Sequence, residues 1–175
     1  MTPTTPWKPT HKTLVRRIAQ WLKWTRRMTV VMSELATRNG ETPDVIGWIG
    51  GASSTLVECK ASRADFLADA GKWFRRHEES GMGDLRYVAA PRGMLSPNET
   101  PEGWGLLEVD DRCVRTTKEA QPKNGNKRAE CVMLMSALRR LELSTAVFVV
   151  SDDGNDGNDG NEGDQEPHPR PHGLH

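Results

Sequence analysis

Three charged residues lie in a stretch of sequence that otherwise has the composition of two buried strands. The stretch is PDVIGWIGGASSTLVECKAS, residues 43–62, and the charged residues are Asp44, Glu58 and Lys60. Side chains in a strand alternate between the two faces of the sheet, so Glu58 and Lys60 are expected on one face and their neighbours on the other. A tight glycine turn between the strands would bring the Asp44 carboxylate beside Glu58.

Two carboxylates and a lysine gathered at one end of a sheet predict metal-assisted chemistry. Close carboxylates repel each other and lose hydration, so they persist mainly where a cation or a shared proton compensates. Oxygen ligands from Asp44, Glu58 and the backbone carbonyl of Cys59 suit Mg²⁺, with Mn²⁺ as its substitute. Such an ion offsets the charge of a phosphoryl group and activates water, while Lys60 would orient that water or stabilise the transition state. The predicted reaction is hydrolysis of a phosphodiester. The alternative is a surface ion pair on an edge strand, with Asp44 acting only as a turn residue.

The elements that must position these residues follow from periodicity, β-branched runs and turn signals. The segment MTVVMSEL has two interpretations, a first strand or a continuation of the preceding helix as far as Asn39-Gly40. The predicted order is a helix at 12–27, strands at 28–35, 44–49 and 54–60, a helix at 62–79, strands at 85–90 and 104–109, a helix at 128–143 and a last strand at 145–150. This order predicts an α/β fold with an αβββαβ core, in which helices flank a mixed sheet. The helix after Ser62 would also place its positive N-terminal end near the three charges.

The charge of the chain is unevenly distributed along its length. The formal net charge is zero, yet residues 151–175 hold seven acids and one base and carry −6, so residues 1–150 carry +6. A basic body suits a polyanionic partner. We expect a flexible segment at 1–11, one nuclease-like domain at 12–150 and a disordered acidic tail rich in Asp, Gly and Asn at 151–175.

The cellular setting is predicted from what the sequence lacks. No apolar run approaches the roughly 18 residues of a membrane helix, and the first residues have no apolar signal-peptide segment. The three cysteines have no CxxC spacing, which argues against a disulfide framework or a zinc knuckle. We therefore expect a soluble, cytoplasmic protein with no membrane partner.

The Pro43-Asp44 and Glu58-Cys59-Lys60 motifs, on adjacent predicted strands, resemble the PD-(D/E)xK nuclease superfamily. The wider run from SELATRNGETPDVIGW to WGLLEV is similar to its MmcB-like branch, which is associated with DNA repair, and to related phage proteins. The resemblance covers about residues 12–115 and implies a restriction-endonuclease-like core. It implies that Asp44 and Glu58 bind metal and that Lys60 is catalytic. Glu34 is a candidate additional ligand, and the sequence leaves open whether it lies in a strand or in a helix.

Two functions follow as expectations from this resemblance. The first is a Mg²⁺-dependent deoxyribonuclease acting in DNA repair, recombination or phage DNA processing. The second is a catalytically silent module of the nuclease fold that binds nucleic acid or a repair partner. DNA is the expected partner, and a homodimer or a repair or phage protein partner is left open. The basic residues expected to contact DNA are Arg16, Lys23, Arg27, Arg63, Lys72, Arg75 and Arg76.

Overall fold

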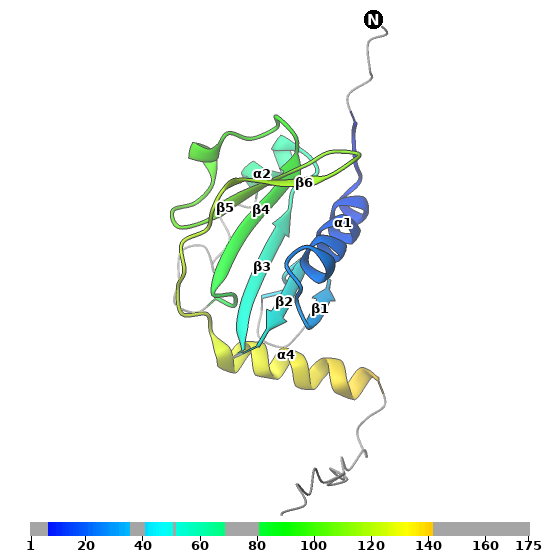
Figure 1. The fold of residues 1–175 in the computed structure, drawn as a ribbon, viewed down its shortest axis with the longest axis vertical. Helices are drawn as coiled ribbons and strands as arrows, with labels where there is room; N and C mark the ends of the chain where they lie inside the picture. Colours follow the sequence, from blue (N-terminus) through cyan, green and yellow to red (C-terminus); the bar gives the residue numbers. More distant parts are fainter. Residues whose placement is uncertain (1–6, 36–40, 51, 69–80, 142–175) are drawn as a thin grey trace, which may run out of the picture. The chain divides into compact units, whose positions relative to one another are not determined.

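The computed structural model describes residues 7–35, 41–50, 52–68 and 81–141 (Figure 1). The described residues belong to one compact unit within residues 1–144, and residues 145–175 lie outside the described residues. Several predictions therefore fall where the structure gives no description. They concern the helix beyond Ala68 with Lys72, Arg75 and Arg76, the strand at 145–150 and the acidic tail at 151–175.

The described elements follow the predicted order, and the structure confirms an α/β fold with a mixed sheet flanked by helices. The sheet has six strands, and its helices include a short 3₁₀ turn, η3. The elements are α1 (His11–Trp24), β1 (Val30–Ser33), β2 (Val45–Ile49), β3 (Ser53–Cys59), α2 (Arg63–Ala68), β4 (Leu85–Pro91), η3 (Pro97–Glu99), β5 (Gly105–Val109), β6 (Val114–Lys118) and α4 (Lys127–Arg140).

The structure differs from the prediction at β6 and at the start of α1. Strand β6 was not predicted, and it forms because the Asp110 side chain accepts hydrogen bonds from the backbone N–H groups of Arg112 and Cys113, which closes a tight turn after β5. Helix α1 begins at His11 rather than at Lys12 and is capped by the Thr10 hydroxyl, which accepts from the Thr13 N–H. The segment MTVVMSEL contains a strand, so the helical alternative for it is wrong.

The strand directions bring the C-terminal ends of several strands to one edge of the sheet. The strand order is β1-β2-β3-β4-β5-β6, with β3, β4 and β5 parallel and the other neighbouring pairs antiparallel. Strands β1, β3, β4 and β5 therefore end at the same edge, where β2 begins; we call this the C-terminal edge. Figure 1 shows β3 running along the middle of the sheet between β2 and β4.

Apolar side chains cover both faces of the sheet. On one face, α1 buries Leu14, Ile18 and Leu22 against strand residues that include Val57 and Cys59, and we call this layer the α1-side core. On the other face, Leu56, Val88 and Leu106 pack with Phe66 of α2 and Met133 of α4, which we call the α4-side core. Tyr87 and Trp104 are 1% and 3% exposed, so both are packing residues of these layers. Among the described residues, no helix combines the length and apolar composition needed to cross a bilayer.

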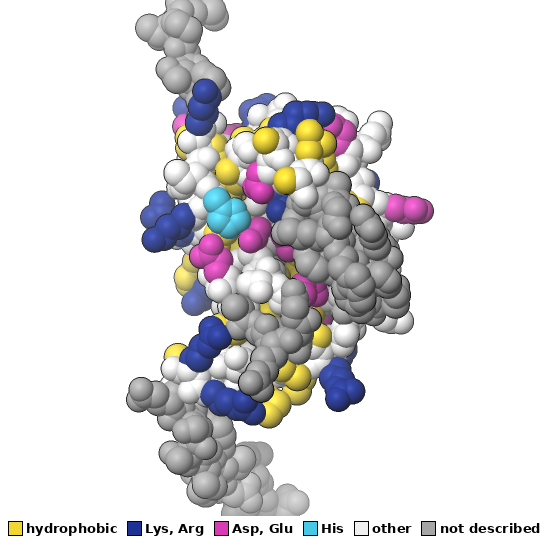
Figure 2. All heavy atoms as spheres, turned by 180° about the vertical axis from the view of Figure 1, so that it is seen from behind, with side chains coloured by type: hydrophobic (Ala, Val, Ile, Leu, Met, Phe, Trp, Pro, Cys, Tyr) yellow, Lys and Arg dark blue, Asp and Glu magenta, His cyan; other side chains and the backbone are white. Residues whose placement is uncertain are grey.

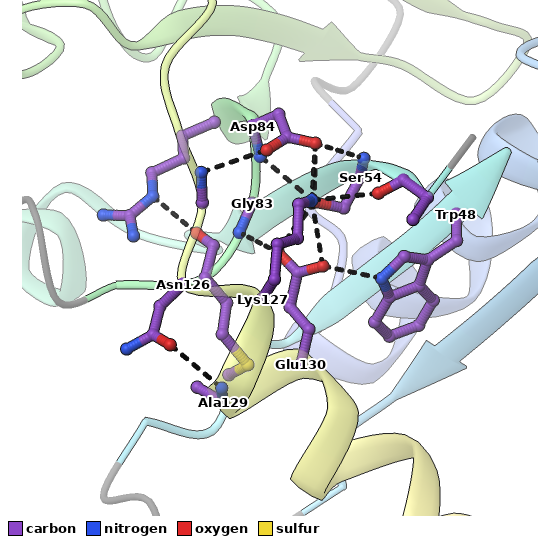
Figure 3. Close-up of polar contacts among 12 residues, drawn as sticks. Trp48, Ser54, Gly83, Asp84, Asn126, Lys127, Ala129 and Glu130 are labelled. Carbon is purple, nitrogen blue, oxygen red and sulfur yellow. Dashed lines mark hydrogen bonds and ion pairs between the residues drawn. The ribbon is translucent and has the colours of Figure 1, made fainter. Parts of the chain in front are cut away.

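A polar network fastens α4 to the end of the sheet opposite the C-terminal edge, where β3 begins (Figure 3). The Glu130 carboxylate, in a residue only 2% exposed, accepts hydrogen bonds from the Trp48 indole N–H at 2.8 Å, the Ser54 hydroxyl at 2.8 Å and the Gly83 N–H at 2.9 Å. Lys127 lies 3.1 Å from the same carboxylate. Because a buried charge is tolerated only when it is paired and hydrogen-bonded, this network sets where α4 can lie.

Asp84 extends this network toward the turn before β4. Its carboxylate accepts from the Lys127 ammonium at 2.6 Å, the Gly125 N–H at 3.0 Å and the Ser54 N–H at 2.8 Å. Burial by itself would raise the pKa of Asp84, but the hydrogen bonds from Lys127, Gly125 and Ser54 together lower the pKa below its ordinary value. Folding is therefore coupled to the ionised form of this side chain.

We expect Glu130→Ala to lower the free energy of unfolding by about 3 kcal/mol or more, because it leaves the Trp48 and Gly83 donors buried without their acceptor. Glu130→Gln keeps one acceptor oxygen and should cost less. Urea unfolding measures both variants, with Cys131→Ala, at an exposed position of the same helix, as the control. Equal stability of Glu130→Ala and the control would contradict this role.

Asp84→Asn should destabilise the protein in a pH-dependent way. Because the folded pKa lies below the unfolded value of about 3.9, the stabilising contribution is present above that pH and is lost as pH falls through the folded pKa. We expect a loss of about 2 kcal/mol at pH 7 that shrinks as the pH falls below the unfolded pKa of about 3.9. Urea unfolding across this range, with Asp111→Asn at an exposed position as the control, measures the effect. A loss that stays constant with pH would show that the charge of Asp84 is not responsible.

Candidate active site at the C-terminal edge

The three charged residues of the opening stretch lie where β3 reaches the C-terminal edge. Glu58 is near the end of β3, and Lys60 follows it, extending the ladder through its N–H, which donates to the Ala89 carbonyl at 2.8 Å. Val57 and Cys59 belong to the α1-side core, whereas Leu56 belongs to the α4-side core. The predicted alternation is therefore confirmed, since Glu58 shares the face of Leu56.

Glu58 and Lys60 form a buried ion pair. The Lys60 ammonium lies 3.6 Å from a Glu58 carboxylate oxygen, and each side chain is 5% exposed. Strand β3 pairs with β2 on one side and β4 on the other, so it is an internal strand. The alternative of a surface ion pair on an edge strand is therefore wrong for these two residues. Desolvating either charge alone would be costly, so each one stabilises the ionised form of the other.

Asp44 reaches the same end of β3 from the neighbouring strand. It directly precedes β2, and the pairing of Val45 with Val57 places it opposite Glu58 in the ladder. Its Oδ2 atom accepts a hydrogen bond of 2.7 Å from the Cys59 N–H, and its side chain is 18% exposed. The Asp44 carboxylate is thus fixed to the backbone of β3 between Glu58 and Lys60.

His11 is a member of this cluster that the sequence did not indicate. Its Nε2 atom lies 3.4 Å from Asp44 Oδ1 and 3.6 Å from Glu34 Oε1. Glu34 follows β1 in a left-handed conformation with a φ of 51°, and its N–H donates to the Asp44 carbonyl at 3.1 Å. Figure 2 shows the histidine bordered by acidic side chains. Since His11 is the first residue of α1, the start of that helix adds a nitrogen group to the site.

The pKa of the neighbouring Cys59 thiol reflects the charges of this cluster. Burial raises the pKa of Cys59 well above its usual value, and the charges of Asp44, Glu58 and Glu34 raise it further, while Lys60 acts in the opposite direction. Cys59 is 0% exposed, so its thiol is a neutral packing group. The cluster therefore has an excess of negative charge around the end of β3.

The candidate metal-ligand atoms of the cluster are carboxylate oxygens, which are the ligands that hard cations prefer. In the part of the chain that the structure describes, no group of three or more His, Cys, Asp or Glu side chains is arranged to hold a metal ion. Asp44 and Glu58 supply carboxylate oxygens, and Asp44 Oδ2 accepts a hydrogen bond from the Cys59 N–H. Mg²⁺ is commonly held by one or two carboxylates together with waters and phosphate oxygens, so two side chains match its usual requirement.

The basic residues predicted to contact DNA are placed as follows. Arg16, Lys23 and Arg27 are exposed on α1 or just beyond it. Arg63 begins α2, where its guanidinium pairs with Glu99 and donates to the Met94 carbonyl at 3.0 Å. Arg16 and Lys23 thus lie on the exposed surface of α1 and Arg27 follows the helix, while Arg63 ties α2 to the η3 segment.

A second buried pair lies in the α4-side core, away from these residues. Arg86 is 1% exposed, donates from Nε to the Met82 carbonyl at 2.7 Å and stacks 5.5 Å from the Trp104 ring. Glu41 lies 4.0 Å from Arg86 and accepts from the Met82 N–H at 2.8 Å. Burial raises the pKa of Glu41, against the lowering effect of Met82 and Arg86. The burial of Arg86 was not predicted from the sequence, and its contacts are those of a structural residue.

Comparison with known proteins adds information on the fold. No family model and no curated protein matches this chain. A solved structure of a protein of unknown function from Silicibacter pomeroyi has a TM-score of 0.60 and 24% sequence identity, covering 80% of this chain and 97% of the other. At this identity the likeness concerns the fold alone.

A double-mutant cycle should detect the coupling between Glu58 and Lys60. Lys60→Met leaves the Glu58 carboxylate buried without its cation and should cost about 3 kcal/mol or more, whereas Glu58→Gln/Lys60→Met should cost less than the two single changes added together. The matched control is the exposed pair of Arg63 and Glu99, for which the coupling should be much smaller because solvent screens it. Urea unfolding gives both energies, and equal coupling in the two pairs would contradict the buried arrangement.

Proposed function

We propose that this protein is a metal-dependent nuclease that hydrolyses DNA phosphodiester bonds, with Mg²⁺ as cofactor and Mn²⁺ as its substitute. The observation that carries the proposal is the meeting of Asp44, Glu58 and Lys60 at the C-terminal edge, with Asp44 fixed to the Cys59 N–H. The resemblance to the PD-(D/E)xK superfamily and its MmcB-like branch supports the same reaction. A role in DNA repair, recombination or phage DNA processing belongs to this proposal.

The two carboxylates have the task of holding the cation. Asp44 and Glu58 provide the side-chain oxygens, and the Cys59 carbonyl adds a backbone oxygen. When bound, Mg²⁺ supplies charge neutralisation at the phosphate and makes water a better nucleophile. Glu34 is exposed by 54% and lies beside His11, so it would act as an additional ligand only from the margin of the site.

Lys60 has a different task, because its charge is opposite to that of the ligands. Its ammonium is 5% exposed, and in such a site a fixed cation acts more strongly than it would in water. During hydrolysis the water oxygen bonds to phosphorus, the ester oxygen leaves as an alcohol, and negative charge grows on the remaining phosphate oxygens. Lys60 would stabilise that charge, which a preorganised group does without reorienting solvent.

The second candidate is a module of the same fold that binds nucleic acid or a repair partner without cutting. The contacts that favour it are the 3.6 Å pair of Glu58 and Lys60 and the 3.4 Å contact of His11 with Asp44. Both contacts direct protein nitrogen groups toward the carboxylates that would otherwise hold a cation. In this candidate the charges serve folding, and loss of any of them leaves no catalytic defect.

We expect Asp44→Asn and Glu58→Gln to abolish cleavage while leaving DNA binding without metal intact, because each variant removes one negative ligand from a hard cation. Lys60→Ala should lower the cleavage rate by about a hundredfold or more, the scale seen when one electrostatic stabiliser is removed. The assay measures cleavage of plasmid, linear, single-stranded and forked DNA with Mg²⁺ or Mn²⁺, and chelator should stop the reaction.

The control is Glu102→Gln, which removes an acid from an exposed position outside the C-terminal edge and should cut at the unaltered rate. Thermal unfolding of each variant identifies losses that come from misfolding. Failure of the unaltered protein to cut any of these substrates would favour the second candidate. Cleavage by Lys60→Ala at the unaltered rate would remove Lys60 from the mechanism.

A further inference from the structure

An open groove lies between α1 and the start of β6, lined by tryptophans and arginines. Its volume is about 350 Å³. Its lining includes the aromatic residues Trp21 and Trp24 and the basic residues Arg17 and Arg112. None of the lining residues is acidic. A groove with this composition, in a chain whose first 150 residues carry +6, is suited to an anionic ligand with flat apolar groups.

Trp24 differs from the other tryptophans near α1 in its exposure. It is the last residue of the helix and is 72% exposed, whereas Trp21 is 9% exposed. The Lys23 ammonium lies 5.3 Å from the centre of the Trp24 ring. An indole kept in water loses the benefit of burial, which makes it available as a flat surface for a ligand.

Positive charge accompanies the aromatic rings along α1. Arg17 lies 5.8 Å from the Trp7 ring and donates to the Asp110 carbonyl, so its guanidinium is held in place beside the groove. Arg26 lies 5.5 Å from the Trp21 ring. Cation and ring pairs of this kind also stabilise helices that bind nothing. What sets this surface apart is that an exposed ring, a groove and exposed bases occur together.

We propose that this groove binds single-stranded nucleic acid, with Trp24 as a platform on which a base stacks and with Arg17 and Arg112 beside the backbone phosphates. Proteins that bind single strands combine these two features, a basic groove and aromatic platforms. A duplex keeps its bases stacked inside, so it cannot use an indole in this way. A protein partner with acidic side chains would satisfy the arginines but would leave the ring without a base to stack on.

The groove and the C-terminal edge are joined by α1. His11 at the start of the helix contacts Asp44, and Trp24 ends it, so these two residues are separated by about 20 Å along the helix axis. A strand bound in the groove would extend along the basic surface of α1 that includes Arg16. The inference concerns binding alone and goes beyond the proposed hydrolysis, since it holds equally for a module that does not cut.

The test measures binding of a fluorescein-labelled oligothymidylate and of a labelled duplex of matched length by fluorescence anisotropy. The full-length protein is used with chelator present, so that cleavage plays no part. We expect tighter binding of the single strand than of the duplex. Trp24→Ala should weaken single-strand binding by about fivefold to a hundredfold, and Trp24→Phe, which keeps a ring, should restore most of it. Arg112→Gln should also weaken binding and lower its dependence on salt.

Two controls make matched changes on α4 and just after it, at residues that do not line the groove. Leu141→Ala removes an apolar side chain that is 68% exposed, and Arg139→Gln removes an exposed base from α4. Neither should change single-strand affinity. The inference is overturned if Trp24→Ala binds the oligothymidylate as the unaltered protein does, if the duplex binds as tightly as the single strand, or if only an acidic peptide such as polyglutamate binds the groove. Because no cleavage is measured, these results are independent of the proposed nuclease activity.

Discussion

Strand β3 is hydrogen-bonded on both sides and covered on both faces, so every charge on it must be compensated within the protein. At its beginning, Ser54 enters the network of Asp84, Lys127 and Glu130. At its end, Glu58 pairs with Lys60, and the Cys59 N–H donates to Asp44. An uncompensated charge at either end would cost several kcal/mol. The positions of β2, β4 and α4 thus follow from the need to satisfy the polar groups of one central strand.

The two ends of β3 are compensated in different ways. In the α4 network, most donors and acceptors meet at hydrogen-bonding distance, and Glu130 accepts from three different parts of the chain. At the C-terminal edge, the ion pairs of Glu58, Asp44 and His11 have separations of 3.4 to 3.6 Å. The first arrangement holds α4 against the sheet and is structural. The second combines ion pairs at these separations with the 2.7 Å hydrogen bond from the Cys59 N–H to Asp44, and the proposed cation site would be built on these carboxylates.

The sequence predicted those features that depend on local periodicity. The alternation of Val57, Glu58 and Cys59 fixes which residues share a face, and the turn between β2 and β3 fixes the register that places Asp44 opposite Glu58. The amphipathic pattern of α1 likewise comes from side-chain spacing within one segment. These properties need no knowledge of how distant segments pack.

The features that the sequence did not predict depend on contacts between distant segments. His11 reaches Asp44 only because α1 packs across the sheet with its first residue at the C-terminal edge. Glu130 is a charged residue of α4 that is buried, and its burial is set by Trp48, Ser54 and Gly83. Strand β6 has polar, half-exposed residues and becomes a strand because β5 offers it a free edge. Burial of the Glu58–Lys60 pair also depended on β4 joining the sheet beside β3.

The carboxylates at the end of β3 are proposed to form a cation site. Electron paramagnetic resonance of Mn²⁺ titrated into the protein tests this claim most directly, because free and bound Mn²⁺ give different signals whether or not DNA is cut. The account predicts binding by the unaltered protein that is lost in the double variant Asp44→Asn/Glu58→Gln and is retained in Glu102→Gln. Binding that is unchanged in the double variant, or absent from the unaltered protein, would contradict it.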